Sequence, residues 1–434
     1  MFMHNALQIL ALSDADLLEQ WRKFSAIDRK IYVVSKWAGV GTSHVCLKHA
    51  ALAMDAIGIS LPFEHYAAFD LDQTCKDVLG TIGCGHVFGD VSAGSCSFWM
   101  QSLCDIGDEL MGSWVASEIC GAPPTDLRAL LHSLNDKYMT WILDNSPEYE
   151  FDLDAVAPCM ACGEGAECRV CPPKDGEVLE FISPTCISWS IRGNQMGWLC
   201  KSNRPFIAWC LQSNFSLPTM AMVECTPALD VRYMQRLMPC FDLTPVIMSP
   251  DLLGFPAGGE RVFIRCLRRS VPRTSLVYEY ETFQKFFFRE LMLTQNVFLL
   301  CSDAELMQYL NFLGNQKHKV PTVFERLPRN AESRKAVLTT QERVRLQHHE
   351  SRAEKFRREA SANLGITSSD ERGANMFIFN ITQNTEHHKG ASPICPRPLR
   401  SCVLWSELRQ SPLTPKELFA IHGISLKHTD ASAC

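Results

Sequence analysis

The sequence predicts an α/β fold with a mostly parallel sheet, helices on both faces and a smaller second domain. Over the first 268 residues, apolar and β-branched runs typical of buried strands alternate with amphipathic stretches typical of helices. The first of these runs ends in a glycine-containing turn that leads into a helical stretch, as in nucleotide-binding α/β folds. From about residue 269 the pattern changes to a mixed segment and then a long, highly charged helix.

Composition limits the possible classes of protein. A chain of 434 residues with 46% hydrophobic content can bury a large core. No apolar stretch has the length of a membrane span, and residues 1–19 lack the basic start of a signal peptide. We therefore expect an intracellular protein, nuclear if eukaryotic, whose 20 cysteines are reduced thiols. The net charge of −6 argues against non-specific coating of nucleic acid, so any such contact requires a local basic face.

The first three predicted strands end in residues suited to a ligand. The run 30–36 is followed by Gly39 and Gly41, which let the backbone approach a bound group, and a helix is expected over 45–57. The strands 65–70 and 86–91 both carry an acid at or near the end, a pattern typical of folds that hold ribose hydroxyls and an adenine amine.

The regular alternation resumes at residue 178. The apolar run 178–182 predicts a strand that is followed by Ser-Pro-Thr and then Cys186, so this thiol is expected at the edge of the sheet. The remaining expected elements are helices over 205–212 and 233–237, and strands over 219–224, 245–248 and 261–265, the last two separated by a turn at 254–256. Further helices are expected over 6–25, 125–145, 339–362 and 415–422, a loop over 367–373 and a strand over 376–380.

Seven segments, in one order, resemble the motifs of the cytosine-5-specific DNA methyltransferases. They are Trp37-Ala38-Gly39-Val40-Gly41, Phe69-Asp70-Leu71-Asp72, Phe88-Gly89-Asp90-Val91, Pro184-Thr185-Cys186-Ile187-Ser188-Trp189-Ser190, Val223-Glu224-Cys225-Thr226, Gly254-Phe255-Pro256 through Arg261-Val262-Phe263, and Leu413-Thr414-Pro415-Lys416-Glu417 through Gly423. The resemblance implies a Rossmann-like fold dependent on S-adenosylmethionine, with a smaller target-recognition domain. It implies a cofactor site made of Trp37, Gly39, Gly41, Asp70, Asp90 and Pro184, and catalytic roles for Cys186, Glu224 and Arg261.

The implied reaction is methylation of carbon 5 of a cytosine flipped out of double-stranded DNA. A thiolate that adds to carbon 6 makes carbon 5 nucleophilic, the role implied for Cys186. A protonated carboxyl near N3 and an arginine beside the exocyclic oxygen stabilise the intermediate, which suits Glu224 and Arg261. The base must leave the duplex because its carbon 6 is otherwise out of reach.

Several positions depart from the family's pattern. Thr185 and Ile187 stand where the family has a proline and a glutamine beside the nucleophile, and Cys225 stands where it has an asparagine. Ala257 and Gly259 replace a glutamine and an arginine. The groups that do the covalent chemistry remain, so we expect a slow enzyme. Methylation of tRNA and cofactor or DNA binding without turnover are the alternatives.

The resemblance also implies where the domains begin and end. Residues 1–268 are expected to form the catalytic domain, with an insertion at about 92–175; residues 269–405 form the recognition region, and 406–434 return to the catalytic domain. A basic concentration over 326–358 lies in the recognition region, where it either tracks phosphates or forms a solvated helix face. It comprises Arg326, Arg329, Arg334, Lys335, Arg343, Arg345, Arg352, Lys355, Arg357 and Arg358.

The insertion contains two cysteine pairs, Cys159/Cys162 and Cys168/Cys171, with the two-residue gaps of zinc knuckles. Only five residues separate the pairs, which is tight for one tetrahedral site. In so cysteine-rich a chain, coincidence is the interpretation that the sequence favours, with a zinc site as the alternative.

Overall fold

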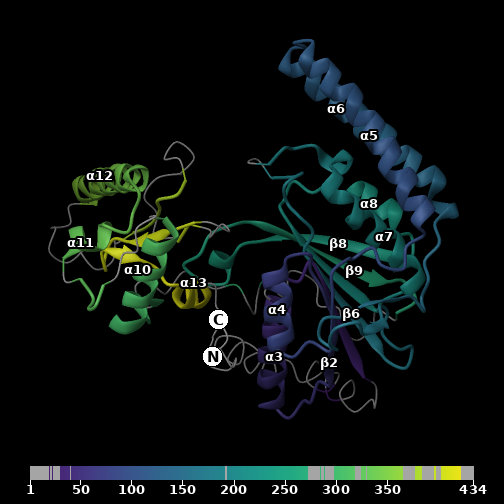
Figure 1. Ribbon diagram of the computed structural model, residues 1–434, viewed down its shortest axis with the longest axis horizontal. Helices are drawn as coiled ribbons and strands as arrows, with labels where there is room; N and C mark the ends of the chain where they lie inside the picture. Colours follow the sequence, from purple (N-terminus) through teal and green to yellow (C-terminus); the bar gives the residue numbers. More distant parts are fainter. Residues whose placement is uncertain are drawn as a thin grey trace. The chain divides into compact units, whose positions relative to one another are not determined.

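The computed structural model describes nine segments, 30–39, 41–190, 193–271, 298–317, 324–328, 330–364, 377–383, 395–396 and 402–421, with residues 19, 22, 284 and 288. The expected helix over 6–25 and the loop over 367–373 lie outside the described residues, apart from Glu19 and Arg22. Contacts divide the chain into two compact units (Figure 1). Unit 1 comprises Met1–Met248, Arg261–Phe286 and Ser432–Cys434, and unit 2 comprises Ser249–Glu260 and Phe287–Ala431.

Unit 1 is built on a seven-stranded sheet with the strand order β3-β2-β1-β6-β7-β9-β8. The strands are β1 Ile31–Lys36, β2 Phe63–Phe69, β3 His86–Phe88, β6 Glu177–Ile182, β7 Met220–Cys225, β8 Phe241–Met248 and β9 Arg261–Arg268. Neighbours from β3 to β7 pair in parallel, whereas β9 is antiparallel to both β7 and β8. The order reverses between β1 and β6, the place where doubly wound sheets bind ligands. The predicted mostly parallel α/β sheet is confirmed.

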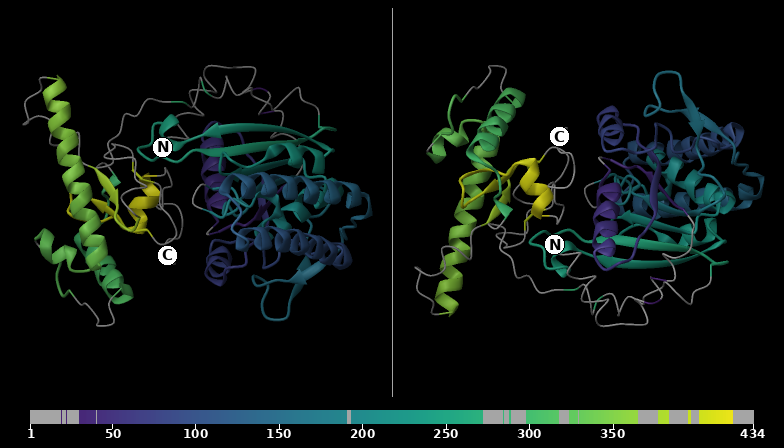
Figure 2. Two further views of the ribbon diagram at one scale, coloured as in Figure 1. Left: turned by 90° about the horizontal axis from the view of Figure 1, so that it is seen from above. Right: turned by 90° about the horizontal axis from the view of Figure 1, so that it is seen from below.

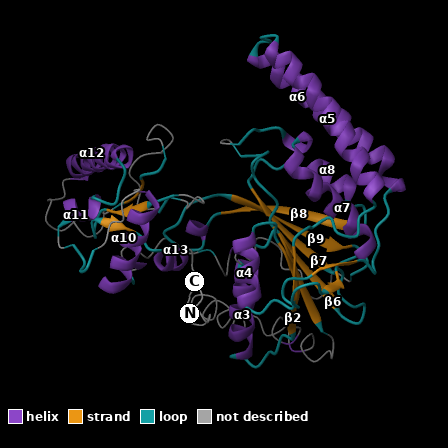
Figure 3. Ribbon diagram, viewed as in Figure 1, coloured by secondary structure: helices purple, strands orange, loops and turns teal. Residues whose placement is uncertain are grey.

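Helices cover both faces of this sheet (Figure 3). Along β2, Ala68 packs with Leu79 of α4 on one face, while Ala67 and Phe69 point to the other, because side chains alternate along a strand. Unit 1 contains α3 Thr42–Asp55, α4 Gln73–Thr81, α5 Ser97–Ile119, α6 Pro124–Asn145, α7 Arg204–Ser216 and α8 Val231–Leu237. Burial from both sides explains why β1 is buried along its whole length. Within the described residues, no helix combines the length and the apolar character needed to cross a bilayer.

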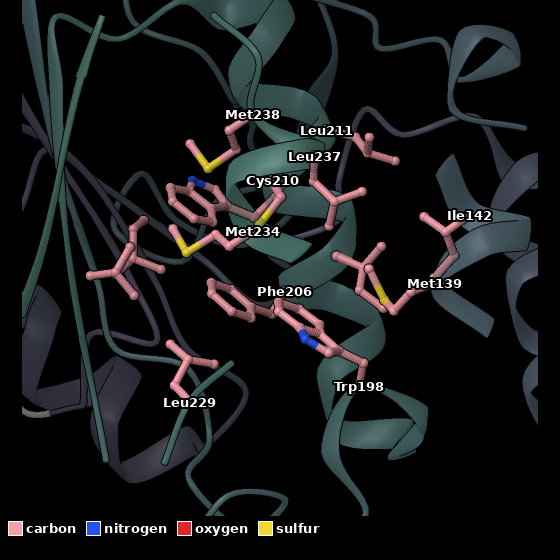
Figure 4. Packing of buried hydrophobic residues seen from close by; sticks show 14 of the residues in the cluster. Met139, Ile142, Trp198, Phe206, Cys210, Leu211, Leu229, Met234, Leu237 and Met238 are labelled. Atoms are coloured by element: carbon pink, nitrogen blue, oxygen red, sulfur yellow. The ribbon is translucent and has the colours of Figure 1, made fainter. Parts of the chain in front are cut away.

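The main core of unit 1 lies between the sheet and α5 to α8 (Figure 4). The ring of Phe206 stacks on Trp198 and on Trp209, each at 5.6 Å between centroids. Met234 and Leu229 of the neighbouring segments complete this layer. Aromatic side chains therefore hold α7 against the sheet.

The insertion is more ordered than its sequence suggested. Besides the expected helix α6, it contains α5, a 23-residue helix that the sequence analysis did not predict, and the two helices lie side by side (Figure 2). The buried residues of α5, Trp99, Leu103 and Gly107, recur every four positions and so form one stripe. A short antiparallel hairpin, β4 Val156–Pro158 with β5 Glu167–Arg169, follows α6.

Unit 2 has a small sheet and a separate core. Its sheet has the order β10-β11-β12, with β10 Ile378–Asn380, β11 Leu404–Ser406 and β12 Ser411–Pro412. Its helices are α10 Asp303–Lys317, α11 Ala331–Lys335, α12 Thr340–Leu364 and α13 Pro415–Ile421. At two helix starts, Ser302/Glu305 and Thr339/Glu342, each side chain accepts a hydrogen bond from the other residue's backbone N–H. At a third, Glu417 accepts from the Thr414 N–H, while its own N–H donates to the Thr414 carbonyl.

Two histidine rings pack against each other between α3 and β2, tilted by 43°. The rings of His44 and His65 are 3.7 Å apart between centroids. Burial, followed by the charges of His44 and Lys48, lowers the pKa of His65 to about 4, and burial also lowers the pKa of His44.

This pair predicts a loss of stability on acidification. The unfolded histidine takes up its proton near pH 6.5 and the folded one near pH 4, so falling pH favours unfolding between these values. The full shift corresponds to about 3 kcal/mol at about 1.4 kcal/mol per unit, and partial solvent access should reduce it to about 1–2 kcal/mol. Urea unfolding at pH 7 and pH 5 should show a smaller pH effect in His65→Gln than in the wild type. Equal pH effects in the two proteins would show that His65 titrates normally.

Candidate active site

The three predicted catalytic residues lie in unit 1, where adjacent strands of the sheet end or begin. Cys186 follows β6 by four residues, Glu224 lies near the end of β7, and Arg261 opens β9. β6 pairs with β7 and β7 with β9, so these segments are neighbours in the sheet although far apart in the chain. The carboxyl ends of parallel strands meet at one edge, which is where the sequence analysis expected them.

Glu224 and Arg261 form an ion pair, with 2.5 Å between Arg261 Nε and Glu224 Oε1. The arginine side chain is 11% exposed and the glutamate 33%, so the pair reaches the surface through the carboxylate. Cys225 lies beside it and is buried. Burial first, and then the nearby charges of Glu224 and Cys186, raise the pKa of the Cys225 thiol to about 11. Cys225 is therefore a buried, neutral thiol next to the ion pair.

The backbone after β6 turns tightly at Cys186. Its carbonyl oxygen accepts hydrogen bonds from the N–H groups of Trp189 at 3.1 Å and Ser190 at 2.8 Å. The Cys186 side chain is half-buried and packs against the main core, while Ile187 next to it is 53% exposed. The sequence places an apolar side chain where the family's pattern has a polar one, and the structure shows that this side chain meets solvent. Pro184, predicted for the cofactor site, is buried.

The segment after Cys186 is anchored from two directions. Ser188 is buried and accepts a 2.8 Å hydrogen bond from Asn203 Nδ2, at the start of α7. Asn135 of α6 donates to the carbonyl of Met196 and accepts from the N–H of Leu199, both at 3.1 Å. The long insertion therefore helps to hold the segment that follows Cys186, a contribution that the sequence did not indicate.

The predicted cofactor turn has an unusual backbone. Trp37, Gly39 and Gly41 all have left-handed φ values, of 55°, 55° and 77°. For Trp37 this conformation is costly, and such strain is typical of functional turns. A side chain at Gly41 would collide with Ile82 Cδ1 at 2.3 Å, whereas one at Gly39 would meet nothing within 4 Å. Gly41 is therefore needed for packing, and Gly39 faces open space.

Asp70 is bonded to this turn. One carboxylate oxygen accepts from the Gly39 N–H at 2.8 Å and the other from the Asp72 N–H at 2.9 Å. Leu71, between the two acids, is 76% exposed. Asp90 is exposed and accepts from the N–H and hydroxyl of Ser92, both at 2.8 Å.

Residues 254–260 of the arginine motif and the closing motif are grouped with unit 2 and support its fold. Ala257 is fully buried and forms a parallel bridge with Cys395. The Leu-Thr-Pro-x-Glu segment caps α13, because Glu417 accepts from the Thr414 N–H at 2.9 Å and Pro415 occupies the first helical position. Contacts thus group the closing segment, up to residue 431, and residues 249–260 with unit 2. The sequence analysis had assigned the former to the catalytic domain.

Most side chains of the basic concentration are engaged within unit 2. Arg357 binds both oxygens of Glu407, at 2.8 and 3.0 Å. Arg334, Arg343 and Arg345 donate to backbone carbonyls, and the other pairs are Lys335 with Glu332 and Glu350, Lys355 with Glu359, and Arg358 with Glu354. This favours the solvated, internally paired interpretation of the run over a phosphate-tracking one. Arg329 lies outside the described residues.

The four-cysteine set proposed from the sequence is brought together only in part. Cys159, Cys162 and Cys168 converge with His86, whereas Cys171 lies outside this group and lines a cavity of about 620 Å³. That cavity lies against β1, β6 and α7 and contains none of the predicted catalytic or cofactor residues.

No known family profile matches the chain, and no curated protein is similar to it in sequence. Solved structures resemble it weakly. A prophage-encoded protein of E. coli, assigned as a DNA modification methyltransferase, aligns with a TM-score of 0.31 and 12% identity over 58% of this chain. Dnmt2 methyltransferase of S. pombe aligns at 0.35 and 11% over 66%, and the methyltransferase EhMeth of Entamoeba histolytica at 0.35 and 11% over 65%. The alignments span 50%, 67% and 67% of those chains. Such similarity assigns no activity to this chain.

Proposed function

We propose that the chain transfers a methyl group from S-adenosylmethionine to carbon 5 of a cytosine in double-stranded DNA. One observation carries this proposal: Glu224 and Arg261, on the neighbouring strands β7 and β9, are ion-paired at 2.5 Å, and Cys186 follows β6, the strand on the other side of β7. A thiol, a carboxylate and a guanidinium at one edge of a sheet suit covalent catalysis on a pyrimidine ring.

Each residue has a distinct part in the proposed reaction. The Cys186 thiolate adds to carbon 6 of the flipped cytosine, the electrons of the 5,6 double bond move toward N3, and the Glu224 carboxyl supplies the proton there. Arg261 orients Glu224 through its Nε and balances negative charge on the exocyclic oxygen. After transfer, a water molecule takes the carbon 5 proton and the Cys186 thiolate leaves carbon 6. The N3 proton returns to Glu224, which restores the aromatic ring.

The turn after β1 fits the cofactor. Bound S-adenosylmethionine would supply the electrophilic methyl group. The open space at Gly39 admits a ligand close to the backbone, and the bonds that Asp70 makes to the turn fix its carboxylate near the same place. Asp90 offers a second exposed carboxylate at the end of the next strand, and Leu71 offers an apolar surface for an adenine ring.

A methyl-transfer assay tests the proposed activity. The wild type and Cys186→Ala are incubated with radiolabelled S-adenosylmethionine and either duplex DNA or tRNA. We expect label in 5-methylcytosine of DNA from the wild type alone. Transfer to tRNA alone would change the substrate class while keeping the mechanism. If Cys186→Ala labelled the nucleic acid as well as the wild type does, the proposed mechanism through Cys186 would be overturned.

The cofactor site makes a separate prediction. Asp70→Ala should weaken binding of S-adenosylhomocysteine by about 10- to 100-fold, because a hydrogen bond to a charged group contributes about 1.5–3 kcal/mol. Calorimetry measures the affinity for S-adenosylhomocysteine. Asp77→Ala is the control, because Asp77 lies on α4, outside the turn, and bonds to Gln73. If the wild-type protein did not bind S-adenosylhomocysteine, the chain would instead be a degenerate protein that has lost its cofactor site.

A further inference from the structure

Four metal-ligating side chains converge in unit 1, away from the proposed active site. The Nδ1 or Nε2 of His86 and the sulfurs of Cys159, Cys162 and Cys168 all lie within 4.8 Å of one another. His86 Nδ1 is 3.7 Å from the Cys159 sulfur and 3.5 Å from that of Cys162, and the sulfurs of Cys162 and Cys168 are 3.5 Å apart. None of these cysteines forms a disulfide.

These distances match those between the ligands of one tetrahedral zinc ion. With bonds of about 2.3 Å to sulfur and about 2.0–2.1 Å to nitrogen, two sulfurs lie roughly 3.8 Å apart, and a sulfur and a nitrogen roughly 3.6 Å apart. Three thiolates and one imidazole form a closed donor set typical of structural zinc and soft enough to exclude magnesium and calcium.

The backbone around Cys159 and Cys162 has the form of a zinc knuckle. Gly163 follows the second cysteine with φ of 108°, and Gly165 has φ of 77°, so the chain folds back in a conformation that favours glycine. The Cys159 N–H donates to the Ala166 carbonyl at 2.8 Å, which closes the loop between β4 and β5. Cys168 lies in the middle of β5, opposite Ala157.

His86 comes from a different part of the fold and was not recognised in the sequence. It is the first residue of β3, the strand at one edge of the seven-stranded sheet. The Met160 N–H donates to the Val87 carbonyl at 2.9 Å, so the loop between the two paired cysteines already bonds to this edge. The ring of Tyr66 packs edge-on against His86 at 5.0 Å, and its hydroxyl donates to the Cys171 carbonyl at 3.1 Å. This anchors the backbone at Cys171, whose thiol lies outside the cluster.

We propose that His86, Cys159, Cys162 and Cys168 bind one structural zinc ion that fastens the β4–β5 hairpin to the edge strand β3. A hairpin of two three-residue strands is too short to be stable alone. Cys159 and Val170 pack into the core beside it, whereas Val156 and Met160 are exposed, so apolar burial holds only one side of the hairpin. Zinc supplies that stabilisation because its binding is coupled to local folding. It also keeps β3 covered against pairing with another chain.

Metal content provides the main test. Protein purified under reducing conditions should contain one zinc per chain by mass spectrometry of the elements. Cys162→Ser and His86→Ala should lose it, whereas Cys171→Ser, a change in the same segment outside the cluster, should keep it. His86→Cys should also keep zinc, because a four-thiolate set suits the ion equally well. These results do not depend on methyl transfer.

Cobalt substitution tests the ligands in the folded wild type. Replacing zinc by Co²⁺ should give the thiolate charge-transfer and tetrahedral visible bands, in the wild type and Cys171→Ser but not in Cys162→Ser. The proposal would be overturned if the purified wild type contained no zinc and gave no such bands with Co²⁺. It would also be overturned if both Cys162→Ser and His86→Ala retained zinc. A Cys162–Cys168 disulfide in place of metal, seen by peptide mapping of protein kept from added oxidant, would also overturn it.

Discussion

Duplex DNA that carries 5-fluorocytosine is expected to form an adduct with this protein that survives denaturation, in the presence of S-adenosylmethionine. Fluorine at carbon 5 cannot leave as a proton does, so elimination is blocked and the covalent bond between Cys186 and carbon 6 remains after methyl transfer. Cys186→Ser should give no adduct, because a serine hydroxyl is a far weaker nucleophile than a thiolate. A band of reduced mobility in a denaturing gel measures the outcome.

Covalent trapping can detect even a very slow enzyme, because each protein molecule has to react only once. The loss of one preorganised contact typically lowers a rate by about 10²- to 10³-fold. Ala257 is buried in a bridge with Cys395, so that position supplies no polar contact to a base. Slow turnover would therefore be hard to see, yet adducts would still accumulate.

Cys240→Ser is the matched control. Like Cys186, Cys240 is a half-buried thiol packed against the main core of unit 1, so its replacement tests for general damage to that core. We expect it to trap as the wild type does. A protein that binds cofactor and DNA but never traps would be a binding member that has lost its chemistry.

Glu417→Ala should be the most damaging single substitution in unit 2, with a loss of about 3–5 kcal/mol in the free energy of unfolding. The Glu417 side chain is fully buried and bonded to both terminal nitrogens of Arg409, at 2.5 and 2.7 Å. Removing one partner of a buried ion pair leaves the other charge uncompensated. It also removes the cap on the Thr414 N–H. Urea unfolding and hydrogen exchange of residues 402–421 measure the effect.

Glu359→Ala is the control for this prediction. Its ion pair with Lys355 is mostly exposed, and such pairs contribute about 0–1 kcal/mol. Joint replacement of Arg409 and Glu417 by Met and Leu should cost less than Glu417→Ala alone, because no buried charge remains. If Glu417→Ala changed stability no more than Glu359→Ala, the buried pair would not hold α13.

The same pair predicts sensitivity of unit 2 to acid. Burial acts to raise the pKa of Glu417, but the hydrogen bonds and charge of Arg409 outweigh it and lower the pKa below 4.5. A carboxyl with a lowered folded pKa stabilises the fold above its unfolded pKa of about 4.3 and loses this contribution as the pH falls through the folded value. The loss should be absent in Glu417→Gln, which cannot titrate.

Local patterns in the sequence determined the sheet and the order of its parts. Buried strands such as β1 read as unbroken apolar runs, and glycines marked the turn that follows, because these signals depend on neighbouring residues alone. The same is true of the Thr414 to Glu417 cap, which is fixed within four residues.

Distant pairings were decided by the tertiary structure. The sequence could place Cys186, Glu224 and Arg261 at strand ends, but only the pairing of β6, β7 and β9 puts these strands side by side and ion-pairs Glu224 with Arg261. Four cysteines formed a pattern in the sequence, yet the fold brings three of them to His86, because the hairpin bonds to the edge of β3. The basic run could not be interpreted until its partners, such as Glu407 for Arg357, were brought close by folding. Spacing along a chain reports neighbours on one element, whereas a site is defined by side chains that only packing brings within bonding distance.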